Sequence, residues 1–172
     1  MKNILFLLLL AALTVSFNAC QNNDNSSAWK EANTNAYNEI TKNPDYSEIQ
    51  TETGPTGVYK KVISSGTGTE HPFQTSEVKI LYKGTYYDGT TFDVGSSQSN
   101  APIEFASVAQ TVRGFSFALQ QMVVGDHWEI WIPYYLGYGA NDYYDPTTYQ
   151  LVAKGYTTLV FDVQLVSITL YP

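Results

Sequence analysis

Residues 78–93, VKILYKGTYYDGTTFD, place a tyrosine, a phenylalanine and a carboxylate within one short stretch of the chain. Tyr82 belongs to an alternation of apolar and polar residues that is typical of a strand with one buried face. Asp88-Gly89 then predicts a tight hairpin turn, and Phe92-Asp93 follows it. One hairpin would therefore deliver aromatic rings, a hydroxyl and an acid to the same region, which predicts a small pocket with aromatic walls.

A pocket of this kind suits a reaction that needs no nucleophile. Rotation about the peptide bond before proline crosses a barrier of about 18–20 kcal/mol, which arises from amide resonance. An apolar pocket can lower this barrier because it removes water from the amide and weakens the charge-separated resonance form. A hydroxyl donor near the carbonyl can stabilise the twisted amide better than the planar one. We therefore expect neither a cofactor nor a metal to be required.

Two further segments have the patterns of elements that could position these groups. Within residues 115–122, the apolar side chains Phe115, Leu119 and Met122 recur at helical spacing, and Gly125-Asp126 ends the segment with a turn. Residues 127–132, HWEIWI, alternate as a strand does and lead into the aromatic loop 133–139. The order is strand, turn, short helix, strand and aromatic loop.

These motifs, in this order, resemble the FKBP-type peptidyl-prolyl isomerases. That family has a strand ending Tyr-x-Gly, then Asp-Gly-x-x-Phe-Asp, a helix between Val-Ile-x-Gly-Trp and Met-x-x-Gly, and the loop Ile-Pro-x-x-Leu-x-Tyr-Gly. Its closing strand, Leu-x-Phe-x-Val-x-Leu, is matched by residues 159–165, LVFDVQL. The resemblance covers residues 55–172. It implies an α+β fold, in which a twisted antiparallel sheet of five or six strands wraps around one short helix, and it implies peptidyl-prolyl cis–trans isomerisation.

The resemblance also implies site residues, position by position. Tyr138 would donate a hydrogen bond to the substrate carbonyl, and Phe161 would close the far side of the pocket. The catalytic set is Tyr82, Asp93, Tyr138 and Phe161. The substrate-binding set is Phe92, Ile103, Phe105, Thr111, Val112 and Phe115. Without the resemblance, Tyr82 and Phe161 fit a plain core role equally well, and Asp93 also fits a loop cap.

Several positions depart from the family pattern. Phe115 stands where a tryptophan is usual, so the floor of the pocket stays aromatic but loses the indole N–H. Thr111 replaces an apolar residue and Ile103 an aromatic one. The loop 140–156 is longer than usual, and Ala153-Lys154 occupies the place of its closing Ile-Pro. We therefore expect turnover that is measurable but weaker than is typical of the family.

The first 19 residues predict a secretory signal peptide. A short basic start precedes the apolar run 4–15, which is shorter than the roughly 20 residues of a membrane-spanning helix. Cys20, the only cysteine of the chain, follows Ala19 at the expected cleavage position. The segment resembles a bacterial lipoprotein signal, which implies lipidation of Cys20. The alternative is an unlipidated signal with an incidental cysteine.

The predicted organisation thus has three parts. Residues 1–19 are the signal peptide, and residues 55–172 are the isomerase domain with its first strand at 58–63. Between them, residues 20–54 hold the lipidated cysteine, a flexible polar tether over 21–27 and a short helix over 28–40. We expect the protein in the cell envelope, anchored by lipid to the outer membrane on its periplasmic or surface face.

Charge and composition limit the partners. The formal net charge of −7 argues against nucleic-acid binding, which requires basic patches. Expected partners are proline-containing unfolded or exported polypeptides and, through the lipid anchor, the membrane; the protein itself is expected to be a monomer. Two other functions stay open: a non-catalytic binding or chaperone module, and an aromatic platform for glycans. The platform residues would be Tyr134, Tyr135, Tyr143, Tyr144 and Tyr149.

Overall fold

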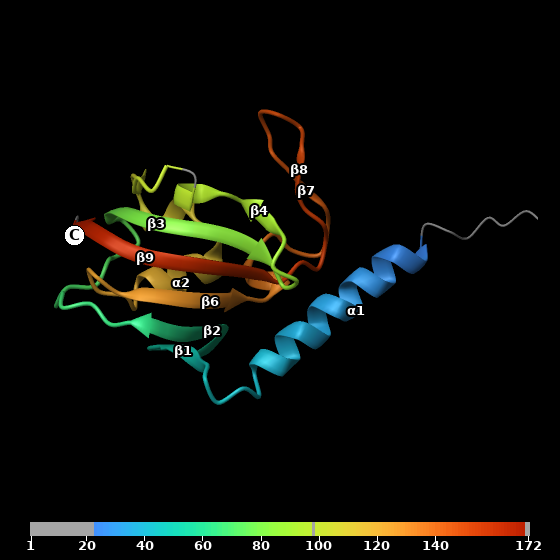
Figure 1. Ribbon diagram of the computed structural model, residues 1–172, viewed down its shortest axis with the longest axis horizontal. Coiled ribbons are helices and arrows are strands. Elements are labelled where there is room, and N and C mark those ends of the chain that lie inside the picture. The colour runs from blue at the N-terminus through green and yellow to red at the C-terminus, as the bar shows by residue number, and fades with distance from the viewer. Residues whose placement is uncertain (1–22, 98, 171–172) are drawn as a thin grey trace, which may run out of the picture.

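The computed structural model of the 172-residue chain describes residues 23–97 and 99–170 (Figure 1). In chain order its helices and strands are α1 (Asn23–Ile40), β1 (Ser47–Thr51), β2 (Gly54–Ser64), β3 (Glu77–Tyr86), β4 (Thr91–Asp93), β5 (Ile103–Phe105), α2 (Arg113–Leu119), β6 (His127–Ile132), β7 (Tyr143–Tyr144), β8 (Leu151–Ala153) and β9 (Leu159–Thr169). Three short 3₁₀ turns, η1 (Gly95–Ser97), η2 (Val108–Gln110) and η3 (Tyr134–Leu136), lie between them.

The main sheet is antiparallel and has seven strands. Its order is β1-β2-β6-β9-β3-β4, and β5 pairs with β3 on the edge opposite β9. The predicted α+β class and the sheet around a short helix are confirmed, but the sheet has more than five or six strands. The strand that was not predicted is β1, which is five residues long and holds a single apolar residue, Ile49.

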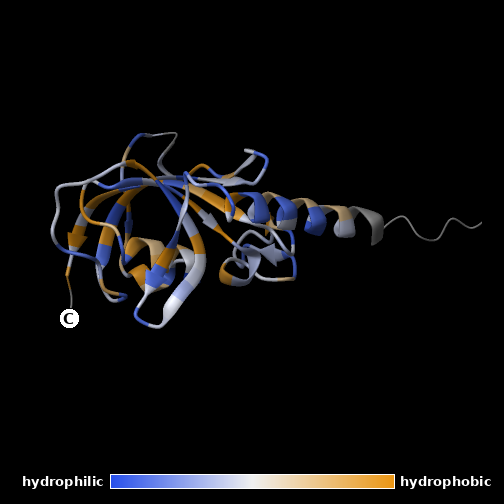
Figure 2. Ribbon diagram, turned by 90° about the horizontal axis from the view of Figure 1, so that it is seen from below, coloured by the Kyte–Doolittle hydropathy of each residue, from blue (hydrophilic) through white to orange (hydrophobic). Residues whose placement is uncertain are grey.

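α2 packs against the concave side of this sheet (Figure 2). Alternate residues of β6 and β9 face the helix, as the period of a half-buried strand requires. Gly114 allows the close approach, because a Cβ at this position would lie 2.4 Å from the Cγ2 atom of Ile132. The residues of these three elements that belong to the buried core are Phe115, Ala118, Leu119, Trp128, Ile130, Ile132, Leu159, Phe161, Val163 and Leu165.

The helix predicted over residues 115–122 is present, with its bounds moved towards the N-terminus. α2 ends at Leu119, and residues 120–122 continue as a turn in which Met122 N–H donates to the Leu119 carbonyl oxygen. The turn predicted at Gly125-Asp126 is confirmed. The Asp126 carboxylate accepts hydrogen bonds from the backbone N–H groups of Gly66 and Val123, both at 2.8 Å.

The hairpin predicted from Asp88-Gly89 joins β3 to β4. Gly89 has a φ of +84°, which favours glycine, and its N–H donates to the Tyr86 carbonyl oxygen at 3.0 Å. The Tyr86 N–H in turn donates to the Thr90 carbonyl oxygen at 2.8 Å. The hairpin brings β4, and with it Asp93, alongside Gly84 of β3.

The N-terminal part differs from its prediction. The helix expected over 28–40 begins at Asn23, so residues 23–27, expected to be a flexible tether, are helical. β1 adds a strand ahead of the predicted first strand. The signal peptide and Cys20 lie outside the described residues. Among the helices that are described, none is long and apolar enough to cross a membrane.

Candidate functional site

A pocket of about 360 Å³ opens where the N-terminal end of α2 meets β3, β4, β5 and β9. Eight of the ten residues predicted for the site line it. They are Tyr82, Asp93, Phe105, Thr111, Val112, Phe115, Tyr138 and Phe161. Gln110 and Tyr143, which were not predicted, complete the lining. Segments far apart in the sequence are thus brought to one cavity by the sheet and the short helix.

Aromatic rings form the floor of the pocket, which we define as Tyr82, Phe115 and Phe161. The centroids of the Phe115 and Phe161 rings are 4.7 Å apart and tilted by 58°. Tyr82 lies 6.2 Å from each of them in tilted or edge contact. Such arrangements are favoured by the ring quadrupoles. The floor is therefore apolar and held by ring-to-ring packing from three different elements.

One carboxylate fixes the polar side of the floor. The Tyr82 hydroxyl donates to Asp93 Oδ2 at 2.9 Å, and Asp93 Oδ1 accepts the N–H of Gly95 at 2.9 Å. Burial, followed by the hydrogen bond to Asp93, raises the pKa of Tyr82 well above its ordinary value. Gly95 fits beside Tyr82 because it has no side chain; a Cβ there would lie 2.3 Å from the Tyr82 carbonyl oxygen. Tyr82 therefore stays a neutral donor engaged with Asp93.

Tyr138 and Tyr143 form the rim. Both belong to a segment that we call the rim loop, residues 137–158, which contains β7 and β8 and returns to β9. Their rings are stacked, with centroids 4.4 Å apart and planes 17° from parallel. Burial, and then the nearby charge of Asp93, raise the pKa of Tyr138 to about 12. In the part of the chain that the structure describes, the Tyr138 hydroxyl has no hydrogen-bond partner, so it is a neutral donor available to a ligand.

The remaining rim lies before α2. The Thr111 hydroxyl donates to the Val108 carbonyl oxygen at 2.8 Å, so the polar group at this position is satisfied locally. Val112 is the N-cap residue of α2 and is half-buried against the core. Although Thr111 stands where the family has an apolar residue, Val112 still gives this side of the rim an apolar edge.

Two residues predicted for the substrate-binding set lie outside the pocket. Phe92 stacks on Tyr86 with ring centroids 5.2 Å apart and meets Phe161 edge-on at 5.6 Å, so it supports the floor from behind. Ile103 pairs with Ile80 in the β5–β3 ladder. Phe92 precedes Asp93 in β4, so the two side chains point to opposite sides of the strand and only Asp93 lines the pocket. Ile103 shares a face of β5 with Phe105 but lies two residues away from it along the strand, outside the lining.

A larger hollow, of about 450 Å³, lies on the opposite face of the sheet. Polar and charged side chains dominate it, including His127 Nε2 at 2.7 Å from Asp162 Oδ1. Of the three floor residues only Tyr82 also borders it, and Phe115 and Phe161 do not. Within residues 23–97 and 99–170 no group of three or more His, Cys, Asp or Glu side chains is arranged to hold a metal ion. The aromatic pocket is therefore the better candidate site.

Comparison with known proteins gives a consistent family. The family model described as FKBP-type peptidyl-prolyl cis-trans isomerase matches residues 68–166. The crystal structure of a peptidyl-prolyl cis-trans isomerase from Pseudomonas syringae pv. tomato matches with a TM-score of 0.68 and 26% sequence identity, covering 84% of this chain and 96% of that one. The match includes most of the residues that build the fold and the pocket.

Two curated relatives match over a similar region. Outer membrane protein MIP of Legionella longbeachae is 34% identical over 114 residues, which are 66% of this chain and 45% of that protein. The FKBP-type 22 kDa peptidyl-prolyl cis-trans isomerase of Escherichia coli is 36% identical over 112 residues, which are 65% of this chain and 50% of that protein. The chain spans about half the length of these relatives.

Proposed function

The chain belongs to the FKBP-type peptidyl-prolyl cis-trans isomerase family, and on this premise we propose that it catalyses the cis–trans isomerisation of Xaa-Pro peptide bonds. The observation that carries the proposal is the aromatic pocket, in which Tyr138 lines the same cavity as the packed rings of Phe115 and Phe161. Among the described residues its hydroxyl has no hydrogen-bond partner. No group in such a pocket has to form a covalent bond with the substrate, because the reaction is a rotation.

In the proposed binding mode the proline ring rests on the floor. Phe115 and Phe161 provide a face wide enough for a pyrrolidine ring, and Val112 covers its edge. The preceding amide is then withdrawn from water, which destabilises the charge-separated resonance form that keeps it planar. The Val112 N–H, at the start of α2, would donate a hydrogen bond to the backbone of the bound peptide.

In the proposed transition state the twisted amide is bound more tightly than the planar one. Tyr138 donates its hydroxyl proton in a hydrogen bond to the substrate carbonyl oxygen, and its raised pKa keeps that proton in place at neutral pH. Asp93 acts on the floor by holding Tyr82 at 2.9 Å, so that the tyrosine ring keeps its orientation. Asp93 thus serves in organising the cavity rather than in proton transfer.

We further propose that the substrates are exported polypeptides met in the cell envelope, and that the protein is held there as a monomer by lipid on Cys20. The placement of the only cysteine after a signal-like segment supports this location. A relative that is named an outer membrane protein is consistent with envelope association.

The direct test of the activity is kcat/KM on a short Xaa-Pro peptide, measured with the chain from about residue 23 onwards. We expect a rate above the uncatalysed one. A rate equal to the uncatalysed one would contradict the enzyme proposal. If that protein still bound unfolded chains, the binding-module function would take its place.

The anchor has a separate test. Mass spectrometry of the full-length protein from a bacterial host should find acyl chains on an N-terminal Cys20, and Cys20→Ser should release the protein from membranes. A wild-type protein that is soluble and unmodified would contradict the lipid anchor and would leave the isomerase proposal untouched.

A further inference from the structure

α1 makes buried polar contacts with the end of the rim loop. The Thr158 N–H donates to Asn33 Oδ1 at 2.8 Å, and the Thr158 hydroxyl donates to the Asn33 carbonyl oxygen at 3.3 Å. Trp29 Nε1–H donates to the Thr157 hydroxyl at 3.2 Å. Asn33, Thr157 and Thr158 are only 1%, 2% and 3% exposed. Buried hydrogen bonds of this kind are costly to leave unmade, so they fix the helix and the loop to one another.

Cation–ring and ring–ring contacts extend this junction. The Lys30 ammonium lies 4.1 Å from the centroid of the Tyr156 ring, and the Lys154 ammonium 5.4 Å from that of Trp29. Trp29 also meets the Tyr86 ring edge-on at 5.7 Å. The Tyr86 hydroxyl donates to the carbonyl oxygen of Val152 in the rim loop at 2.9 Å. α1 and the β3–β4 hairpin therefore both hold in place the part of the rim loop that leads back to β9, residues 152–158, which we call the returning half.

The returning half is in turn bonded to the half that carries the rim tyrosines. The Tyr156 N–H donates to the Gly139 carbonyl oxygen at 3.0 Å, next to Tyr138. The Gly155 N–H donates to Asp142 Oδ1 at 2.9 Å, next to Tyr143. Tyr143 itself pairs with Ala153 in the β7–β8 ladder. A displacement of residues 153–158 would therefore move both rim tyrosines.

We propose that α1 is a positioning element of the pocket, in which Trp29 and Asn33 fix the rim loop and thereby place the Tyr138 hydroxyl over the floor. Its catalytic consequence rests on the proposed isomerase function. Neither Trp29 nor Asn33 lines the pocket, so both act through the loop.

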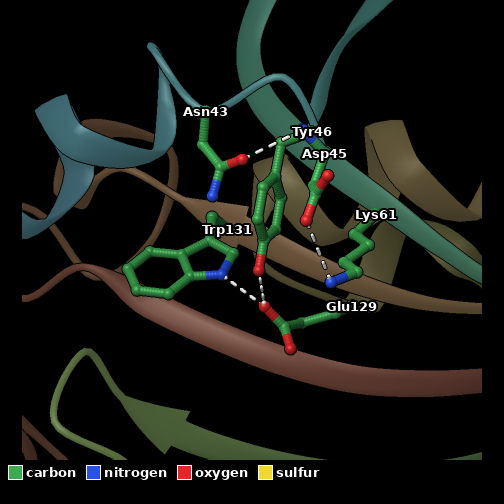
Figure 3. A network of polar contacts seen from close by, with 6 residues as sticks. All are labelled: Asn43, Asp45, Tyr46, Lys61, Glu129 and Trp131. Carbon is green, nitrogen blue, oxygen red and sulfur yellow. Dashed lines mark hydrogen bonds and ion pairs between the residues drawn. The ribbon is translucent and has the colours of Figure 1, made fainter.

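A second attachment of α1 provides a control. Beyond the C-terminal end of the helix, Tyr46 donates to Glu129 Oε1 at 2.5 Å, and Trp131 Nε1–H donates to the same oxygen at 2.7 Å (Figure 3). Asp45 Oδ2 lies 3.6 Å from Lys61 Nζ in the same network. None of these residues lines the pocket. Tyr46→Phe therefore loosens the same N-terminal segment without touching the rim loop.

The first measurement is limited proteolysis of the folded chain from about residue 23 onwards. Chymotrypsin cleaves after tyrosine, and Tyr144 and Tyr149 in the rim loop are 52% and 81% exposed. We expect Asn33→Ala to raise the rate of cleavage between residues 140 and 156 at least threefold, with Tyr46→Phe close to wild type. Trp29→Phe, which removes the N–H donor to the Thr157 hydroxyl and keeps the bond from that hydroxyl to the Lys154 carbonyl oxygen, should also raise it.

The second measurement is a double-mutant cycle on kcat/KM. If α1 acts by placing the Tyr138 hydroxyl, Asn33→Ala should lower kcat/KM at least threefold in the wild-type background and by less than twofold in the Tyr138→Phe background. A general loss of folded protein would lower both equally. Circular dichroism at the assay temperature establishes that each variant is folded.

The outcomes separate this proposal from the isomerase proposal. If wild type is inactive, the isomerase proposal fails, and the proteolysis still decides whether α1 fixes the rim loop. If wild type is active, unchanged proteolysis in Asn33→Ala, or equal losses of kcat/KM in the two backgrounds, overturns the positioning role. If Asn33→Ala does not fold, Trp29→Phe gives the same decision, because it removes a contact between α1 and the rim loop and leaves the Thr157–Lys154 hydrogen bond of the loop in place.

Discussion

The floor and the rim of the pocket are held by different kinds of interaction. The floor residues Phe115 and Phe161 belong to α2 and β9, which pack on one another in the core, and β9 is paired on both sides. The rim residues Tyr138 and Tyr143 belong to a loop whose position depends on hydrogen bonds to α1 and on the two-stranded β7–β8 ladder. Core packing therefore stabilises the floor, whereas the hydrogen bonds of a loop position the rim of the same cavity.

It follows that substitutions in the two regions should be measured differently. A change in the floor removes apolar contacts from the core and must appear in the free energy of unfolding before it can be interpreted as chemistry. A change in the rim removes contacts from a partly exposed loop, and its main effect should appear in kcat/KM. A rim variant that unfolds the protein, or a floor variant that does not destabilise it, would contradict this difference between the two regions.

The largest effect is expected beneath the floor, at Leu119. This side chain is fully buried in α2, so Leu119→Ala should reduce the free energy of unfolding by about 2–5 kcal/mol. Urea denaturation followed by circular dichroism measures the change. Tyr149→Ser in the exposed rim loop is the matched comparison, and it should stay within about 0.5 kcal/mol of wild type.

A loss below about 0.5 kcal/mol at Leu119 would place α2 on the surface and contradict the packing that supports the floor. A large loss at Tyr149 would show instead that the rim loop is part of the cooperative core. Either result would remove the distinction between the two regions.

The next effect is expected at Asp93, where floor and rim meet. Asp93→Ala deprives the Tyr82 hydroxyl and the Gly95 N–H of their acceptor, and a hydrogen bond to a charged group is worth about 1.5–3 kcal/mol. We expect kcat/KM to fall by about tenfold or more as the orientation of Tyr82 is lost. Asp88→Ala is the control, because Asp88 accepts the Thr90 N–H in the same hairpin outside the pocket. Equal losses in both variants would assign the effect to the hairpin rather than to the site.

The floor could be predicted from the sequence because its signals are local and periodic. Alternation in β6 and β9 and the helical spacing of Phe115 and Leu119 indicate which side chains face inwards, and the family motifs name the polar residues. A motif match does not say which residues of a short strand border the cavity, and Phe92 and Ile103, which the motifs also indicated, lie outside the lining.

The rim could not be predicted in the same way. Tyr143 is one of several tyrosines in residues 134–156, and only the path of the loop distinguishes it from its exposed neighbour Tyr144. The loop path depends on contacts with Asn33, more than a hundred residues away in the sequence. α1 carries too few apolar residues to indicate that it packs on the domain, since much of its attachment is made by polar groups.

A smaller effect is expected in the rim itself. Tyr138→Phe removes one hydroxyl and keeps the ring stacked on Tyr143. A neutral hydrogen bond contributes about 0.5–1.5 kcal/mol, so kcat/KM should fall from a few-fold to about tenfold with an unchanged free energy of unfolding. Tyr144→Phe, a neighbouring hydroxyl outside the pocket, is the control. If Tyr138→Phe had wild-type kcat/KM, the hydroxyl would not be the donor to the carbonyl.

The smallest effect on kcat/KM is expected from a change of pH within the range in which Tyr82 and Tyr138 both keep their protons. Burial raises the pKa of Tyr138 to about 12 and raises that of Tyr82 as well, so floor and rim donors stay neutral through and beyond physiological pH. We expect kcat/KM to vary by less than about twofold between pH 6.5 and 9.5, although an unperturbed tyrosine, with a pKa near 10, would already be about a quarter ionised at the upper end of this range. A protease-free assay, such as exchange spectroscopy on an Xaa-Pro peptide, avoids the pH dependence of a coupled enzyme.

Above this range the same pKa shifts act on stability. In the unfolded chain these tyrosines lose their protons near the ordinary value of 10, whereas in the folded protein they retain them to higher pH. The unfolded state therefore binds fewer protons between these values, and the stabilisation present below pH 10 is lost as the pH rises towards 12. Urea denaturation at each pH should show this decline, with kcat/KM lost only as the protein unfolds. If kcat/KM instead fell with a midpoint near pH 8 while the free energy of unfolding stayed constant, a group other than Tyr138 would control turnover, and the rim would have to be reassigned.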